Sequence, residues 1–172
     1  MLFFAIAFAS ALVVGTFVEY WGHRLMHTGG ILKRRHARHH RMGSGQGFLG
    51  EFRDYALPTL AIVWMGFLVS PAAGFGFLIG DLMYAAVAAW SHQLQHEHPH
   101  KVWWMAQPQH SVHHHHQEWH TNFGMTTDIW DKVFRTYRRH ELLPDIGRSD
   151  ARAWSIHWAS VSEPLPVRKR RS

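Results

Sequence analysis

Long apolar runs separated by basic, histidine-rich segments are the feature that most limits how this chain can fold. Residues 1–18 carry no charge, and about 20 apolar residues suffice to span a bilayer as a helix. No basic residue precedes this run, which favours a retained membrane helix over a signal peptide. A second apolar block covers residues 56–90, and Ser70 and Pro71 interrupt it, so it predicts a hairpin of two helices.

We therefore predict an all-α fold, an integral-membrane helical bundle with about three to four membrane helices. The predicted spans are about 1–21, 56–70 and 72–91. Pro58 suits the first turn of its helix. Asp81, the only charge within the second block, should face protein and make a structural hydrogen bond, because a carboxylate facing lipid is costly.

The remaining segments, 22–55, 92–140 and a basic tail 141–172, are polar and contain all 17 histidines. Segments rich in Lys and Arg belong on the cytoplasmic side of a membrane. Three crossings then place the N-terminus outside and gather the histidines in a cytosolic helical cap. We expect one domain over residues 1–172, located in a bacterial cytoplasmic membrane.

Composition excludes several kinds of site. The chain has no cysteine, which excludes disulfides, iron–sulfur clusters and thiolate zinc sites, so any metal site must use His and carboxylates. The net charge of +6 is compatible with nucleic-acid binding. However, the basic residues flank apolar runs, as they do beside membrane helices, and we predict no nucleic-acid partner.

Histidines recur in four motifs of alternating type. The motifs are HxxxH at His23–His27, HxxHH at His36–His40, HxxxH at His92–His96 and HxxHH at His110–His114. Residues three and four apart share one helix face, so each motif presents its imidazoles together. A single HxxxH is more often an ordinary surface or core feature. Four motifs, each pair beside a predicted membrane boundary, indicate a metal centre.

The motifs supply more imidazoles than one ion can use, so we predict a dimetal site in the cap. Imidazole suits iron, zinc, copper and nickel, and a structural zinc ion needs only four ligands. The ten candidate ligands are His23, His27, His36, His39, His40, His92, His96, His110, His113 and His114.

Five further residues are candidates for an additional ligand or for a group that orients one. His115 and His116 extend the last run, so HxxxHH through His115 is an alternative register to HxxHH. His120 and Asn122 follow closely. Glu19 lies four residues before the first histidine, where it either hydrogen-bonds a ligand imidazole or caps the membrane boundary. Among the other histidines, His98 and His100 are interpreted as solvated loop residues.

The ordered set of motifs resembles the fatty acid hydroxylase superfamily, which includes sterol desaturases, sphingolipid and fatty acid hydroxylases, and carotene hydroxylases. The phrase Asn122–Gly124 followed by Trp130–Tyr137 is similar to the closing signature of that superfamily. The resemblance covers His23–Tyr137. One departure is Arg135, where the family usually has glycine at a local turn.

The resemblance implies a membrane oxygenase that holds two iron ions, for which zinc can substitute on purification, with dioxygen as co-substrate. It implies hydroxylation or desaturation of a membrane lipid, with a metal centre on the cytoplasmic side. Electrons would come from a separate ferredoxin-type or haem-protein donor and its reductase, since no flavin, haem or ferredoxin-like motif is present.

Two alternatives stay open at this stage. The short chain and the spacing between the first two motifs are similar to bacterial carotene hydroxylases, although those usually lack the closing Trp-Asp phrase. A histidine-rich membrane protein that binds or transports metal would instead place ligands along the span. The sequence distinguishes neither among fatty acyl, sterol, hopanoid and carotenoid substrates nor between hydroxylation and desaturation.

Overall fold

The computed structural model describes residues 1–29, 32–42, 45–117, 119–140 and 156–159, so most of the predicted tail lies outside the described residues. Every regular element in these ranges is a helix, which confirms the predicted all-α fold. The elements are α1 (Leu2–Thr28), α2 (Lys33–Met42), α3 (Phe48–Leu60), α4 (Trp64–Val69), α5 (Pro71–Glu97), the 3-10 helix η1 (Pro99–Lys101), α6 (Gln109–His116) and α7 (Ile129–Val133).

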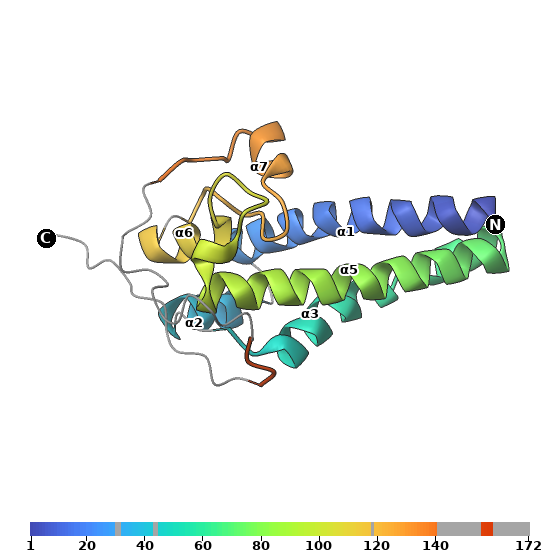
Figure 1. Cartoon of the computed structure of the whole chain (residues 1–172), viewed down its shortest axis with the longest axis horizontal. Coiled ribbons are helices and arrows are strands. Elements are labelled where there is room, and N and C mark those ends of the chain that lie inside the picture. The colour runs from blue at the N-terminus through green and yellow to red at the C-terminus, as the bar shows by residue number, and fades with distance from the viewer. Residues whose placement is uncertain (30–31, 43–44, 118, 141–155, 160–172) are drawn as a thin grey trace, which may run out of the picture.

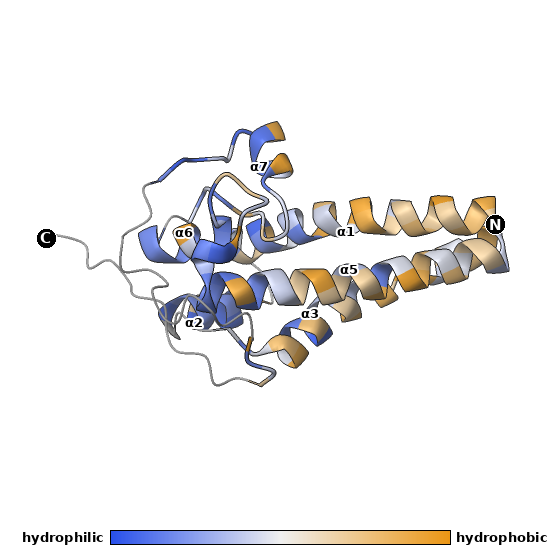
Figure 2. Ribbon diagram, in the orientation of Figure 1, coloured by the Kyte–Doolittle hydropathy of each residue, from blue (hydrophilic) through white to orange (hydrophobic). Residues whose placement is uncertain are grey.

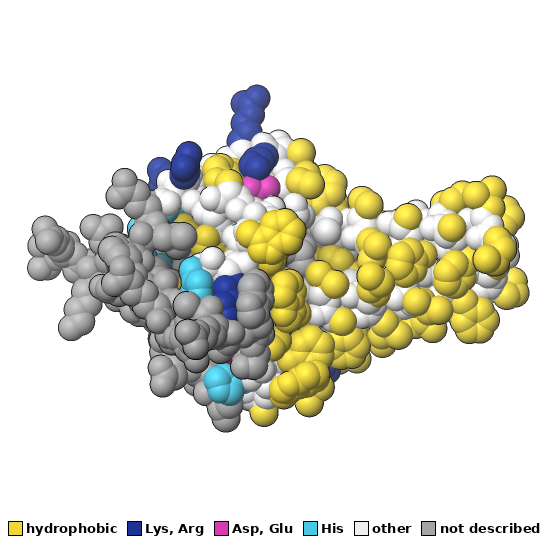
Figure 3. Space-filling view, in the orientation of Figure 1, with side chains coloured by type: hydrophobic (Ala, Val, Ile, Leu, Met, Phe, Trp, Pro, Cys, Tyr) yellow, Lys and Arg dark blue, Asp and Glu magenta, His cyan; other side chains and the backbone are white. Residues whose placement is uncertain are grey.

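The molecule consists of a long helical shaft with a polar cap at one end. Helices α1 and α5 and the α3–α4 pair lie side by side in the shaft, and α2, α6 and α7 gather around the end opposite the N-terminus (Figure 1). Three stretches are long and apolar enough to cross a membrane, 2–28, 48–69 and 71–97. Hydrophobic residues dominate the shaft and hydrophilic ones the cap (Figure 2). The outward side chains of the shaft are mainly hydrophobic, as lipid contact requires (Figure 3).

The second span begins earlier than predicted. Helix α3 starts at Phe48 rather than near residue 56, so Pro58 lies inside the helix near its end and not in its first turn. The acidic residues in the first part of α3 have partners within the protein. Asp54 pairs with Arg35 at 2.6 Å and with Arg53 at 2.9 Å, and Glu51 points into the cap. Helix α3 ends at Leu60, and α4 completes the crossing after a short turn.

Helices α1 and α5 approach each other closely at glycines. A β-carbon on Gly80 would lie 2.6 Å from the backbone oxygen of Phe8, and one on Gly76 would collide with Phe4. Small residues four apart let helix backbones pack directly in a membrane. Asp81, the residue after Gly80, is 1% exposed, which confirms that it faces protein. The α1–α5 contact therefore fixes the two helices that lead to the cap.

Both HxxxH motifs lie on the ends of spanning helices. Helix α1 continues to Thr28 and α5 to Glu97, so each carries its histidine pair on the same helix as its apolar run. Helix α5 begins where the apolar block was predicted to break. Ser70 caps its first turn by accepting a hydrogen bond from the Ala73 backbone N–H at 3.1 Å, and Pro71 occupies the first position.

Helix α7 is attached to the shaft by a side-chain hydrogen bond. The Trp130 indole donates to Thr16 Oγ1 at 2.9 Å, which ties α7 to α1. Arg135, which replaces the glycine usual in the family, has a φ of 58°, in the left-handed region that favours glycine. The backbone here therefore adopts a conformation typical of glycine, although the residue is arginine.

Candidate metal centre

Nine of the ten histidines predicted as ligands converge in the cap, in two groups that could each hold a metal ion. Within a group, one ring nitrogen of each histidine lies within 4.8 Å of those of all the others. The first group is His23, His27, His36, His40 and His113, and the second is His39, His96, His110 and His114. Every member except His39 is buried.

The two groups share two of their helices. Helix α1 contributes only to the first group and α5 only to the second, whereas α2 and α6 contribute to both. In α2, His36 and His40 join the first group and His39 joins the second. In α6, His113 joins the first group, and His110 and His114 join the second. The stacked rings of His40 and His114 have centroids 4.1 Å apart, so the groups are neighbours. The HxxHH motif thus serves two adjacent sites from one helix.

The first group is centred on His27, from α1. Its Nε2 lies 2.8 Å from Nε2 of His36, 2.9 Å from that of His113 and 3.3 Å from that of His23. The Nε2 atoms of His36 and His40 are 3.0 Å apart. Three helices, α1, α2 and α6, therefore direct the same ring nitrogen into one small volume.

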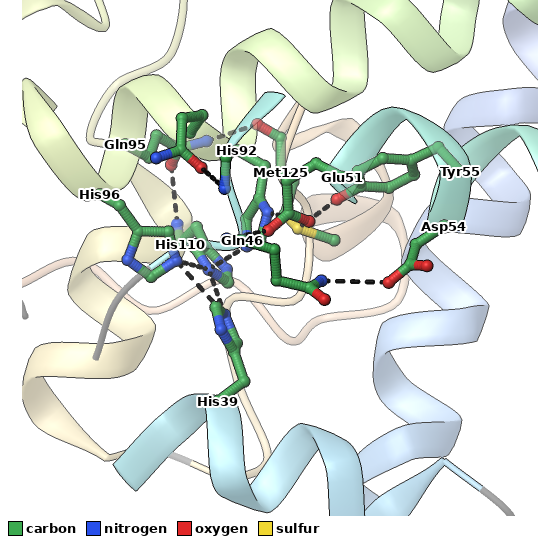
Figure 4. A network of polar contacts seen from close by, with 12 residues as sticks. His39, Gln46, Glu51, Asp54, Tyr55, His92, Gln95, His96, His110 and Met125 are labelled. Atoms are coloured by element: carbon green, nitrogen blue, oxygen red, sulfur yellow. Dashed lines mark hydrogen bonds and ion pairs between the residues drawn. The ribbon is translucent and has the colours of Figure 1, made fainter. Parts of the chain in front are cut away.

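The second group is centred on His110, from α6. Its Nε2 lies 2.9 Å from Nε2 of His96 and 3.3 Å from that of His39 (Figure 4). His92, the tenth predicted ligand, lies at the edge of this group, with its Nε2 2.6 Å from that of His110. All ten histidines therefore lie in or directly beside the two groups.

Hydrogen bonds on the outer side of the rings set which nitrogen carries the proton. His23 Nδ1 lies 2.6 Å from the Phe123 carbonyl oxygen, and His113 Nδ1 lies 2.8 Å from that of Thr121. A carbonyl oxygen only accepts, so each Nδ1–H donates and each Nε2 keeps its lone pair. These lone pairs face the interior of the first group, as they do for metal-ligating histidines.

A buried carboxylate performs the same task for the second group. Glu51 Oε2 lies 2.6 Å from His92 Nδ1, and both side chains are almost fully buried (Figure 4). The Gln46 backbone N–H donates to the other oxygen, Oε1, at 2.9 Å. Glu51 therefore directs the His92 Nε2 toward His110.

The donor set fits metal ions. His114 is 1% exposed, and neither of its ring nitrogens has a hydrogen-bond partner among the residues that the structure describes. A polar atom left so is costly unless something else binds it. Burial holds the pKa of His110, His113 and His114 well below its usual range, and burial lowers the pKa of His40 to about 3. These four imidazoles are therefore neutral at pH 7, which is the form that binds metal.

The family model for fatty acid hydroxylase matches residues 8–136, three quarters of the chain. The chain belongs to the fatty acid hydroxylase family. No curated protein and no solved structure matches it.

Family membership and geometry agree on the nature of the protein. The matched range contains both histidine groups, and the three apolar spans make this fatty acid hydroxylase family member an integral membrane protein. Membership indicates a lipid hydroxylase or desaturase whose histidines are compatible with a metal site.

The structure selects a register for the last histidine run. His110, His113 and His114 enter the groups, as HxxHH requires. The His115 side chain is buried outside both groups, with its ring against that of His116 at a centroid distance of 4.9 Å. Three further histidines lie outside both groups. His116 stacks on His140 at 4.1 Å, His120 is exposed, and His98 is buried rather than solvated.

Asn122 braces the loop rather than any histidine. Its side-chain amide donates to the Arg138 backbone oxygen at 2.9 Å, and its side-chain oxygen accepts from the Arg138 backbone N–H at 2.9 Å. Asn122 thus joins the two ends of the segment that contains α7.

The contacts of Glu19 match neither of its two predicted roles, a hydrogen bond to a ligand imidazole or a cap at the membrane boundary. Its Oε1 accepts from the backbone N–H groups of Met125 at 2.8 Å and Thr126 at 3.0 Å, and its Oε2 accepts from the Tyr84 hydroxyl at 2.5 Å. Within the described ranges, no imidazole hydrogen-bonds this carboxylate. It holds the loop whose Phe123 carbonyl orients His23, so it acts on that histidine through the backbone.

The Glu19 contacts predict a specific order among variants. Glu19→Ala leaves two buried backbone N–H groups without an acceptor, at a cost of about 1–3 kcal/mol each. Glu19→Gln retains a carbonyl oxygen for both donors. We expect the alanine variant to lose metal affinity and thermal stability and the glutamine variant to stay near wild type. Equal loss in both would show that the charge, not the acceptor, matters.

Two acidic residues of the site escaped prediction. Glu51 precedes the second apolar block without a motif around it, and only an acid near the start of an apolar helix hints at it. Asp131 belongs to the closing Trp-Asp phrase, but no role could be assigned to it. It accepts from the backbone N–H groups of Phe123 at 2.9 Å and Gly124 at 2.7 Å. Asp131 and Glu19 therefore fix the same loop from opposite ends.

Proposed function

We propose that this protein is a membrane di-iron oxygenase that hydroxylates or desaturates a lipid. Hydroxylation would consume dioxygen, two electrons and two protons and give an alcohol and water. Desaturation would use the same inputs and give an alkene and two waters. The proposal rests on the two adjacent imidazole groups, buried except for His39, at the end of a membrane bundle.

The residues of both groups, with His92, would hold the irons through Nε2 atoms. Bound iron, reduced by an external donor, would supply the activation of dioxygen and the oxidation of an unactivated C–H bond. Phe123, Thr121 and Glu51 would keep the ligand rings oriented. The buried side chains of Phe123 and Met125 would help to exclude water from the imidazoles.

The partners of this reaction follow from the composition. Without cysteine the chain holds no iron–sulfur cluster of its own, so a separate ferredoxin-type or haem-protein donor would deliver the electrons. A lipid substrate would enter laterally from the membrane. We place the metal centre on the cytoplasmic side of a bacterial membrane, because the cap is rich in Lys and Arg.

A metal carrier is the alternative from a different class. It requires ligands distributed along the membrane span. Both histidine groups instead lie at the cap end, where α1 and α5 leave the shaft (Figure 1). This arrangement supports a fixed centre over a transport path.

Isotope-labelled dioxygen tests the proposal. Iron-loaded protein, a reducing system and a panel of fatty acyl, sterol, hopanoid and carotenoid lipids are incubated under the labelled gas. Hydroxylation puts the label into the lipid, whereas desaturation gives a new double bond and label only in water. The panel also identifies the substrate class. Iron-loaded protein that modifies none of these lipids would contradict the proposed function.

A further inference from the structure

The outward face of α2 is strongly basic. Lys33, Arg34, Arg38 and Arg41 are all exposed on this helix. Together with Ala37 they line an open depression on its surface. Four positive charges thus lie within about 12 Å along one helix, at a rise of about 1.5 Å per residue.

The basic residues lie on the side of α2 that faces away from the metal centre. With about 3.6 residues per turn, positions 33, 34, 37, 38 and 41 form one side of the helix. His36, His39 and His40 form the other side and supply both histidine groups. A helix with its side chains is about 10–12 Å across. The basic surface is therefore one helix thickness from both groups.

The part of the chain that the structure describes leaves these four charges without a carboxylate partner. The contrast is Arg35 on the flank of the same helix, which pairs with Asp54 at 2.6 Å. Uncompensated charges clustered in this way attract a partner of opposite sign and raise its association rate.

We propose that the outward face of α2 docks the electron donor, a soluble redox protein with an acidic surface. This inference rests on the proposed function, which requires electrons from outside the chain. Charge complementarity would steer the donor to the element that contributes histidines to both groups. Docking there would bring its redox group toward both irons at once.

The composition of α2 favours a protein partner over the membrane surface. Helices that lie on a membrane combine basic residues with large apolar ones such as Trp, Phe and Leu. The sequence of α2, KRRHARHHRM, has no such residue, and its non-basic side faces the metal centre. Anionic lipid head groups are therefore the competing outcome of the test.

Binding of an acidic plant-type ferredoxin tests the docking site. The triple variant Arg34→Gln, Arg38→Gln, Arg41→Gln is compared with Lys132→Gln, Arg135→Gln, Arg139→Gln, which removes the same charge near α7 on another side of the cap (Figure 1). Affinity for oxidised ferredoxin is measured in a detergent with neutral head groups. We expect the α2 variant to bind about tenfold more weakly and the control within about twofold of wild type. At about 1 M salt, where the Debye length is about 3 Å, the difference should vanish.

Other outcomes overturn the docking site. Equal weakening in both triple variants would mean that net charge alone attracts the ferredoxin. Unchanged ferredoxin binding with weaker binding to phosphatidylglycerol vesicles would assign the face to lipid head groups.

A second readout keeps this test separate from that of the proposed function. Reduction of the iron by reduced methyl viologen, a small cation, should not slow in the α2 variant, and its iron content should not change. Ferredoxin binding to α2 without reducible iron would support docking and contradict the oxygenase. Reducible iron without ferredoxin binding would contradict docking alone.

Discussion

Replacing His110 by alanine is expected to abolish lipid oxidation and to remove about half of the bound iron. The His110 Nε2 lies within 3.3 Å of the Nε2 atoms of His39, His92 and His96, so it is the centre of the second group. Loss of a residue that merely orients a ligand typically costs 10–100-fold. Loss of a central ligand should cost more, about a thousandfold or beyond. Iron content and product formation on the same preparation measure both effects.

A companion variant and a control make this prediction specific. His113→Ala should remove iron from the first group, so the double variant with His110→Ala should hold almost none. His100→Ala changes an exposed histidine outside both groups and should leave both readouts unchanged. Full iron in His110→Ala, or equal loss in His100→Ala, would contradict the two-group assignment.

Replacing Glu51 should give the second largest effect, about 10–100-fold in metal affinity or turnover. The carboxylate lies 2.6 Å from His92 Nδ1 in a buried setting, where a charged partner interacts more strongly than a neutral one. Glu51→Gln keeps an acceptor and should fall at the lower end of the range. Glu51→Leu removes the acceptor and should fall at the upper end. Competition with a chelator measures the metal affinity.

Asp54→Asn is the matched control for Glu51. Asp54 lies one turn along the same helix, but it pairs with Arg35 and Arg53, whose side chains are more than half exposed. Exposed ion pairs contribute about 1 kcal/mol or less. We expect near-normal metal affinity in Asp54→Asn. Equal losses in Asp54→Asn and Glu51→Gln would show that Glu51 acts through general charge rather than through His92.

Periodicity explains why the histidines were predictable. Spacing of three and four residues dictates a shared helix face, and the apolar runs of α1 and α5 dictate where those helices leave the membrane. These two local rules suffice to place His23, His27, His92 and His96 at the cap. The division of each HxxHH motif between two groups was not predictable, because it depends on how α2 and α6 sit against the shaft.

The supporting residues depend on contacts distant in the sequence. Glu51 meets His92 across two helices, and Glu19 meets Met125 across more than half of the chain. The i, i+4 rule places Glu19 beside His23, but the Phe123–Thr126 loop takes its hydrogen bonds instead. Sequence spacing alone carries no information on such a loop. The predicted start of α3 was too far along the chain for a related reason. The acidic residues Glu51 and Asp54 in its first turns have partners on other helices, which the sequence does not reveal.

Mössbauer spectroscopy and metal analysis of protein expressed with iron-57 test the central claim most directly. We expect about two irons per chain, each in a nitrogen-rich environment. The two irons should be close enough for magnetic coupling, because the His40 and His114 rings, one from each group, stack at 4.1 Å. A single iron, or two without magnetic coupling, would contradict a di-iron centre built from these histidines.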